Sequence, residues 1–180
     1  MKNVNDISFM IQARLDSKRL PGKMLLPFGE SNLFEIAIQK LVDCKSIPNR
    51  NIYLALYDQE LKDIAGKYPV NVFHRSEDSV GESKEPRVVS EWGHELPHKW
   101  FVTVNACAPL LKVETIESFV KYYLESEHRS LFSVHSNNNF FWDSKGNMIT
   151  KYPGSLDSKL VDTTYSGAHV LYAGLSLIHI

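Results

Sequence analysis

Short apolar runs alternate with amphipathic segments along most of the chain. Runs rich in β-branched, aromatic and leucine residues predict strands, which lie at 7–13, 51–57, 70–73, 100–105, 130–136 and 165–173. Between them, apolar residues at spacings of three and four predict helices, which lie at 32–44, 58–68, 86–96 and 112–126. Strands that alternate with helices are typical of a mostly parallel sheet covered on both faces. The pattern therefore predicts an α/β fold.

Polar residues at the helix starts refine these boundaries. Ser31 or Asn32 is placed to cap the helix at 32–44, and Asp58 is placed to cap the helix at 58–68. The segment 86–96 is the weakest of the helix predictions. The pair Tyr122 and Tyr123 lies in the strongest predicted helix, where we expect core positions.

The pattern changes after residue 136. Two apolar patches flank "SKGN" at 144–147, which favours a hairpin turn. We expect a single domain at 1–174 with an arm at about 137–164. The aromatic residues at 140–142 would then favour a dimer contact, because exposed aromatic side chains need covering. No helix follows the last strand, so we expect truncation and a non-native tail at 175–180.

Composition and charge narrow the class of protein. The 180 residues are 43% hydrophobic and 23% charged, which is ordinary for a globular domain. With 20 basic and 21 acidic residues the formal charge is −1, which disfavours a nucleic-acid partner. Cys44 and Cys107 are too few for a disulfide framework or a zinc site. Lacking a signal-peptide pattern and a membrane-spanning run, the sequence predicts a soluble, cytoplasmic protein without a membrane partner.

A local concentration of positive charge follows the first predicted strand. The segment "QARLDSKRLPGK" at 12–23 contains Arg14, Lys18, Arg19 and Lys23, with Asp16 among them. In parallel sheets, ligands bind beyond the carboxyl ends of the strands. Cationic side chains and backbone N–H groups are the usual partners of phosphate. The segment therefore indicates a phosphate site, although a basic loop that only faces water is the alternative.

Two further observations bear on this loop. The dipeptide Pro21–Gly22 bends it and lets its backbone approach a ligand. The loop after the strand at 100–105 starts near Asn105, and we expect both loops to meet at one crevice. Neither G-x-x-x-x-G-K-[ST] nor G-x-G-x-x-G is present, so the segment is not one of these common phosphate-binding motifs.

The segment "IQARLDSKRLPGKMLLPFG" resembles the N-terminal pattern of cytidylyltransferases that activate acidic sugars. This family includes CMP-sialic acid synthetases, CMP-Kdo synthetases and spore-coat polysaccharide (SpsF-type) proteins. The matching positions are Ala13, Arg14, Ser17, Lys18, Leu20, Lys23, Pro27 and Gly29. Similar but less specific matches are "VFHRSED" at 72–78, "VTVNACAPLLKVETI" at 102–116 and "YSGAHVLYA" at 165–173.

The resemblance implies a Rossmann-like, three-layer nucleotidyltransferase fold with a β-hairpin arm that forms a homodimer. It implies transfer of CMP from CTP to an acidic, sialic-acid- or Kdo-like sugar with release of pyrophosphate, for surface-polysaccharide biosynthesis. The nucleotide-binding residues would be Ala13, Arg14, Leu15, Ser17, Lys18, Lys23, Arg75 and Asn105. Among them, Arg14 and Lys23 are the catalytic candidates that would neutralise the leaving pyrophosphate together with Mg²⁺.

The sequence also departs from the family pattern. Cys107 stands where some members have an aspartate that holds the metal, and a thiol is a poor ligand for Mg²⁺. Asp16 is favoured as a local partner of Arg14 or Arg19, so the metal ligands stay unknown. A non-catalytic nucleotide- or sugar-binding homologue and a nucleotidyltransferase for another nucleoside triphosphate are the alternatives. The sequence identifies neither the sugar nor the base, and it leaves open whether this fragment is active.

Overall fold

The chain consists of a main unit and a smaller arm unit. The computed structural model describes residues 1–81, 85–151, 153–155 and 157–176. The main unit comprises Met1–Leu131 together with the segment from Val170 onward, and the arm unit comprises Phe132–His169. The arm predicted at about 137–164 lies inside the arm unit. The tail predicted at 175–180 lies largely outside the described residues, since 177–180 are not among them.

The strands follow the predicted apolar runs closely. Those that the structure describes are β1 (Ile7–Gln12), β2 (Pro27–Phe28), β3 (Ser31–Asn32), β4 (Ile52–Leu56), β5 (Asn71–His74), β6 (Trp100–Val104), β7 (Leu131–Asn137) and β8 (Thr164–Leu175). Six of them form one sheet in the order β5-β4-β1-β6-β8-β7 over the described residues, and β2 pairs with β3 in a separate small hairpin. The mostly parallel α/β sheet predicted from the sequence is therefore confirmed.

The strand order places a topological switch at β1. Strands β5, β4, β1 and β6 run parallel, with Gln12 opposite Ala55 and Met10 opposite Thr103, whereas β8 is antiparallel to β6. The chain moves from β1 to β4 and β5 on one side and continues with β6 on the other. The loops after β1 and β6 therefore diverge at the carboxyl edge, which is where open α/β sheets bind ligands.

Helices cover this sheet and position its edge. The described helices are α1 (Leu33–Asp43), α2 (Gln59–Ala65), α3 (Glu77–Val80), α4 (Pro86–Val89) and α5 (Val113–Glu125), and the short 3₁₀ turns are η1 (Val4–Asp6), η2 (Asn49–Asn51), η3 (Glu91–His94) and η4 (Ser158–Leu160). Asn32 caps α1, since its side chain accepts a hydrogen bond from the Glu35 N–H at 2.9 Å. This confirms one of the two predicted caps.

The core has two parts, one on each face of the sheet. On one face, apolar residues of β1, including Phe9 and Ile11, pack with α1, α2 and α5. On the other face, Met10 packs with Ala55 and with Trp92 of η3. Residues 7–11 of β1 are 0% exposed, because this central strand is buried on both faces. The result is the three-layer arrangement that the sequence predicts.

The helix predictions required three corrections. The helix predicted at 58–68 is shorter, and the Asp58 side chain does not cap it. The helix predicted at 86–96 is divided into α4 and η3, because Ser90 between them has φ −113° and ψ 40°. Tyr122 is 57% exposed and only Tyr123 of the pair is buried, because successive helix residues point about 100° apart. The short elements α3, β2 and β3 were not predicted.

The arm unit contains the predicted turn. Trp142 and Met148 form an antiparallel bridge, and the Asp143 N–H donates to the Asn147 carbonyl at 2.8 Å. Gly146 has φ +83°, a conformation that favours glycine, so the "SKGN" turn is confirmed. Within the unit, Asn137 reaches from β7 to the Ser166 hydroxyl of β8 at 3.1 Å.

None of the helices in the described part of the chain combines the length and the apolar content that crossing a bilayer requires.

Candidate functional site

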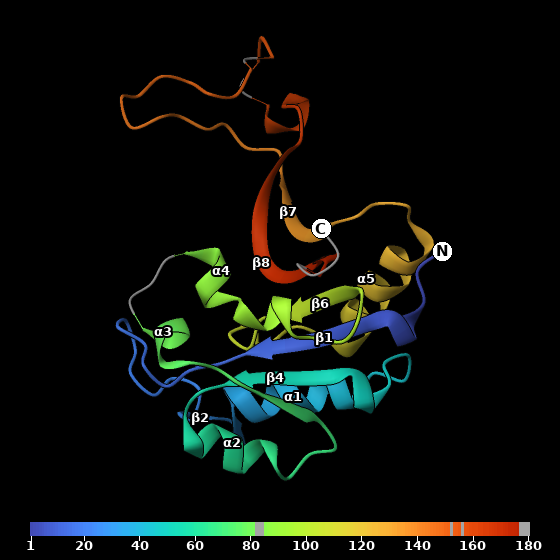
Figure 1. Cartoon of the computed structure of the whole chain (residues 1–180). Helices are drawn as coiled ribbons and strands as arrows, with labels where there is room; N and C mark the ends of the chain where they lie inside the picture. The colour runs from blue at the N-terminus through green and yellow to red at the C-terminus, as the bar shows by residue number, and fades with distance from the viewer. Residues whose placement is uncertain (82–84, 152, 156, 177–180) are drawn as a thin grey trace. The chain divides into compact units, whose positions relative to one another are not determined.

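Four loops leave the main sheet at the same edge. Arg14, Asp58, Arg75 and Asn105 lie within two residues of the ends of β1, β4, β5 and β6, respectively. Because these strands are parallel, their carboxyl ends share one edge. Figure 1 shows the arrowheads of β1, β4 and β6 pointing to the side where α3 and the blue loop after β1 lie. The sheet thus gathers the predicted site segments within the main unit.

The first loop, residues 15–22, is closed at its base. The Gly22 N–H donates to the Leu15 carbonyl at 3.0 Å, and the Leu15 N–H donates to Oδ2 of Asp58 at 2.9 Å. Gly22 has φ +65°, so the predicted bend at Pro21–Gly22 uses a backbone conformation that glycine adopts freely. Leu15 is therefore held through both its amide hydrogen and its carbonyl oxygen.

The predicted phosphate-binding side chains differ in exposure. Ser17 is 9% exposed, and Ala13 is buried with its N–H donating to the Ala55 carbonyl at 3.3 Å. Lys18 is exposed, whereas Lys23 is partly exposed. The loop therefore presents cationic side chains on a base whose backbone is fixed.

Arg14 links the first loop to the segment after β5. Its Nη1 donates to the Val80 carbonyl at 2.5 Å and to the Gly81 carbonyl at 3.3 Å. These bonds use one terminal nitrogen of a guanidinium that carries five N–H groups. The side chain stays partly exposed. Arg14 is thus anchored without being buried, as a residue that binds an external anion needs to be.

Arg75, one of the predicted nucleotide-binding residues, follows β5 directly. It is 5% exposed, and its Nε donates to the Ser79 hydroxyl at 3.1 Å. Its Nη2 donates to the Ser79 carbonyl and, at 3.4 Å, to the Val89 carbonyl. Burial lowers the pKa of the Arg75 guanidinium, partly offset by the carboxylates of Glu91 and Asp58, while Arg14 lowers it further. Arg75 holds α3 and α4 at the sheet edge, and its contact with nucleotide stays a prediction.

Asn105 begins a tight turn after β6. Its N–H donates to the Val170 carbonyl at 2.9 Å, and its Oδ1 accepts from the Cys107 N–H at 2.9 Å. Lys40 of α1 also fixes this turn, because its Nζ donates to the carbonyls of Ala108 at 2.9 Å and Pro109 at 2.5 Å. The exposed side chains of Asn105 and Cys107 are therefore presented by an ordered backbone.

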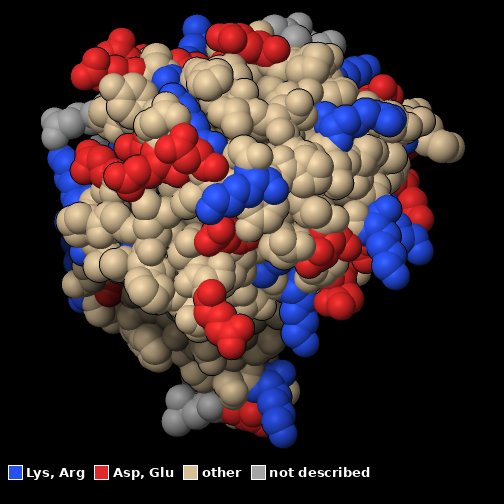
Figure 2. Space-filling model, turned by 90° about the horizontal axis from the view of Figure 1, so that it is seen from below, with Lys and Arg blue, Asp and Glu red and all other residues tan. Residues whose placement is uncertain are grey.

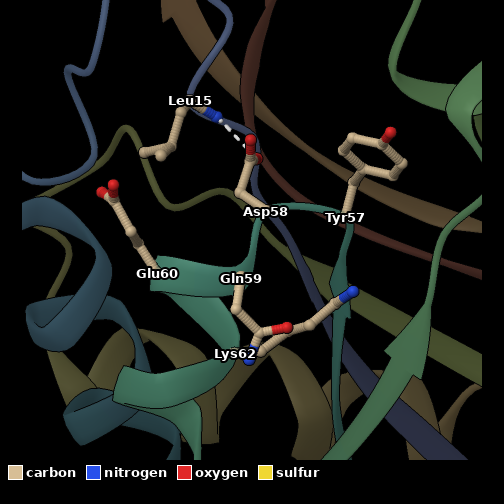
Figure 3. Close-up of a pocket in the computed structure, with 6 residues that line it drawn as sticks. All are labelled: Leu15, Tyr57, Asp58, Gln59, Glu60 and Lys62. Atoms are coloured by element: carbon tan, nitrogen blue, oxygen red, sulfur yellow. Dashed lines mark hydrogen bonds between the residues drawn. The ribbon is translucent and has the colours of Figure 1, made fainter.

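A hollow lies at the base of the first loop. It has a volume of about 510 Å³ and is lined by Leu15, Tyr57, Asp58, Gln59, Glu60 and Lys62. Figure 3 shows the hydrogen bond from Leu15 to Asp58 at one wall, whereas Glu60 projects from α2 without reaching that bond. The sequence pattern does not identify Asp58 as a site residue, because an aspartate directly before a helix predicts a cap.

The described residues do not form a cage for Mg²⁺. They contain no group of three or more His, Cys, Asp and Glu side chains placed to hold a metal. Cys107 is exposed on the turn after β6, and sulfur is a poor partner for Mg²⁺. The metal ligands therefore stay unknown.

Charge elsewhere on the surface is mixed. On the face shown in Figure 2, acidic and basic side chains are interspersed and do not gather into a patch of one sign. Because the formal charge of the chain is only −1, attraction of an anion depends on local clusters such as the first loop and not on a strong net field.

The fold is that of nucleotidyltransferases. The structure aligns with a CMP:2-keto-3-deoxy-manno-octonic acid synthetase complexed with CTP at a TM-score of 0.69 and 15% identity, covering 96% of this chain and 75% of that one. The sequence pattern of a family described as cytidylyltransferase matches residues 8–173. The chain therefore belongs to the cytidylyltransferase family.

Two curated relatives are similar in sequence. The spore coat polysaccharide biosynthesis protein SpsF of Bacillus subtilis is 36% identical over 83 residues, which are 43% of this chain and 35% of that protein. A 3-deoxy-manno-octulosonate cytidylyltransferase of Francisella philomiragia is 28% identical over 121 residues, which are 67% of this chain and 47% of that protein. The chain thus spans less than half the length of these relatives.

Proposed function

We propose that this chain carries the CTP-binding part of an enzyme that transfers CMP from CTP to an acidic sugar and releases pyrophosphate. The observation that carries the proposal is the cationic loop 15–22, closed at its base and preceded by the anchored Arg14, at the switch point of the sheet. Loops at this place are the usual ligand sites of open α/β sheets. The names of the relatives supply the nucleotide and the kind of sugar.

In the proposed reaction, a sugar hydroxyl oxygen attacks the α-phosphorus of CTP. A bond forms between that oxygen and phosphorus, the bond from the α-phosphorus to the bridging oxygen breaks, and pyrophosphate leaves with that bonding electron pair. The hydroxyl proton passes to solvent. Such reactions depend on holding the reactants in line and on stabilising the charge that develops on the leaving group.

The first loop and the residues that flank it would carry most of that work. Arg14 would grip phosphate oxygens through the remaining N–H groups of its guanidinium, and Lys23 would add a compact positive charge. Ser17 and Lys18 would bind the same triphosphate. Ala13 and Leu15, whose N–H groups donate to Ala55 and Asp58, would line the site beside it. Arg75 would act on the nucleotide mainly by holding the segment after β5, and Asn105 would approach it from the other side of the switch point.

Mg²⁺ remains part of the proposal, since it would neutralise charge on the phosphates. The described residues supply no cage for it, and Cys107 does not suit it.

The identity of the acidic sugar is supported only by the names of two relatives. A nucleotidyltransferase for another base is a rival that a panel of the four nucleoside triphosphates separates. A non-catalytic homologue that binds a nucleotide or a sugar is a second rival, and Cys107 is the observation that favours it. Release of pyrophosphate by the protein would exclude it.

The arm unit supports the proposal of a homodimer. Several of its large apolar side chains are exposed in the single chain, namely Phe132, Val134, Phe141, Trp142, Met148, Ile149, Leu160 and Tyr165. Covering such a set is favourable. We expect Trp142→Ser to shift the protein toward monomer in light scattering, with Tyr57→Ser on the main unit as the control. A wild type that is monomeric at high concentration would contradict the dimer.

A cytoplasmic location also stays a proposal.

Isothermal titration with CTP, with and without Mg²⁺, tests the nucleotide assignment. We expect saturable binding of CTP that is tighter than binding of ATP, GTP or UTP. Absence of heat at millimolar CTP would contradict the proposal. Pyrophosphate release in the presence of candidate acidic sugars then tests the transfer itself, on the longest available form of the protein.

A further inference from the structure

Asp58 occupies the cap position of α2 but does not cap it. Its backbone is extended, with φ −67° and ψ 133°, as at other helix starts, yet its side chain makes no capping hydrogen bond to α2. Instead, Oδ2 of Asp58 lies 2.9 Å from the backbone nitrogen of Leu15, which is 43 positions earlier in the chain. The carboxylate therefore serves the loop after β1 and not the helix that it precedes.

Leu15 is the point where the first loop closes. Its carbonyl accepts the Gly22 N–H at 3.0 Å, so the loop returns to Leu15. Figure 3 shows the hydrogen bond by which Asp58 holds this residue. Ser17 and Lys18 lie inside this closed segment, and Lys23 follows it directly. One side-chain hydrogen bond thus fixes the base of the loop that carries or precedes the residues predicted to bind triphosphate.

The charge of Asp58 makes this position informative. A carboxylate near a triphosphate repels it, so charge alone would favour a neutral residue here. A hydrogen bond from a backbone N–H to a carboxylate is, however, stronger than one to a neutral acceptor. Asp58 also lies close enough to Arg75 to oppose the lowering of its pKa. Asp58 therefore bonds to the base of the first loop and offsets part of the effect of burial on Arg75.

We propose that Asp58 is a positioning residue for triphosphate binding, which acts by fixing the Leu15 amide at the base of loop 15–22. The expected effect on CTP binding rests on the proposed function. The expected effect of Asp58 on the order of loop 15–22 does not depend on it. Asp58 touches no phosphate in this scheme, so it is not a catalytic residue.

The experiment compares wild type with Asp58→Ala, Asp58→Asn and Glu60→Gln. Asn keeps an oxygen that can accept the Leu15 N–H, whereas Ala removes the acceptor. Glu60→Gln removes a carboxylate from the same hollow without touching Leu15. Amide hydrogen exchange of Leu15 is measured by NMR with the buried Leu54 of β4 as reference, and CTP affinity is measured by titration.

We expect Asp58→Ala to speed exchange at Leu15 by about tenfold relative to Leu54 and to weaken CTP binding by a similar factor, because one charge-assisted hydrogen bond is lost. Asp58→Asn should recover most of both properties. Glu60→Gln should leave exchange at Leu15 unchanged and CTP affinity equal or slightly higher. Retention of wild-type exchange and affinity in Asp58→Ala would overturn the proposal. Uniformly faster exchange throughout the protein would overturn it too, because it would indicate only general destabilisation.

The two proposals fail in different ways. If wild type binds CTP and Asp58→Ala binds it equally well, the positioning role is wrong and the proposed function stands. If wild type binds no CTP, the proposed function is wrong and so is the consequence for triphosphate. Exchange at Leu15 then still decides whether Asp58 orders the loop.

Discussion

Nη1 of Arg14 lies 2.5 Å from the carbonyl oxygen of Val80, the last residue of α3. The last carbonyl groups of a helix have no partner within the helix, so a guanidinium satisfies one of them. The loop after β1 and the segment after β5 are therefore joined by a side chain that is itself a predicted phosphate ligand.

Arg14→Ala should weaken CTP binding at least tenfold, or about 1.4 kcal/mol, because it removes a charged fork and loosens α3. The CTP affinity of Arg14→Lys should lie between those of wild type and Arg14→Ala, since lysine keeps the charge but not the paired N–H donors of arginine. Isothermal titration measures this. Arg19→Ala in the same loop is the control, because Arg19 is exposed and lies outside the predicted ligand set. Equal losses for both arginines would mean that only the summed charge of the loop matters.

Arg75→Met should destabilise the fold by about 1–3 kcal/mol, because the buried carbonyl of Ser79 loses a charged donor. Urea unfolding measures the change. Arg87→Met on α4 also removes an arginine, but from an exposed position, and should change stability little. If both variants unfold alike, the hydrogen bonds of Arg75 do not stabilise the segment after β5.

CTP should slow the reaction of Cys107 with a thiol reagent. Cys107 is exposed on the turn that begins at Asn105, whereas Cys44 is buried and should react only when the protein unfolds. The two thiols therefore provide a fast and a slow phase in one experiment. Protection of Cys107 by CTP but not by free phosphate is the expected result. A rate that saturating CTP does not change would place the nucleotide away from this turn.

The free energy of unfolding should fall above pH 9. Burial, followed by the carboxylates of Glu117, Asp43 and Glu114, raises the pKa of the Cys44 thiol to about 12 from a reference of 9.0. Between these values the unfolded chain loses the thiol proton and the folded protein keeps it. Stability is therefore fully present below pH 9 and declines above it, by about 1.4 kcal/mol for each pH unit.

Urea unfolding at about pH 8 and about pH 10.5 measures this slope. Cys44→Ala should make the decline shallower, although Tyr123, whose pKa burial raises to about 12, keeps part of it. Cys107→Ala is the control that removes a thiol from the surface. A slope in Cys44→Ala that matches wild type would show that the buried thiol does not titrate as described.

Apolar periodicity was sufficient to predict the long strands and helices of this protein. The runs at 7–13 and 51–57 correspond to β1 and β4, because central strands of a parallel sheet are apolar on both faces. The prediction of one helix at 86–96 was wrong. Trp92 packs in the core beside Met10, and the helix is interrupted at Ser90. Such tertiary packing outweighs helix propensity and leaves no local pattern.

The candidate site was predictable as a location but not as a set of contacts. A cationic segment after the first strand indicated the edge, since strand order alone brings it to the switch point. The long-range hydrogen bonds were not predictable. The sequence pattern predicts Asp58 as the cap of α2 and Arg75 as a nucleotide-binding residue. It does not indicate that Asp58 bonds to Leu15 or that Arg75 bonds to Val89.

Lys40 has a consequence for the design of chimeric enzymes. It extends from α1, the helix that follows the first loop, and donates to the carbonyls of Ala108 and Pro109 beyond β6. Grafting α1 from a relative that lacks an amine at this position would remove this donor from both carbonyls, and the Ala108 carbonyl would keep only the Leu111 N–H at 3.1 Å. The recipient would then have a misplaced turn at Asn105 even though every residue of that turn was retained.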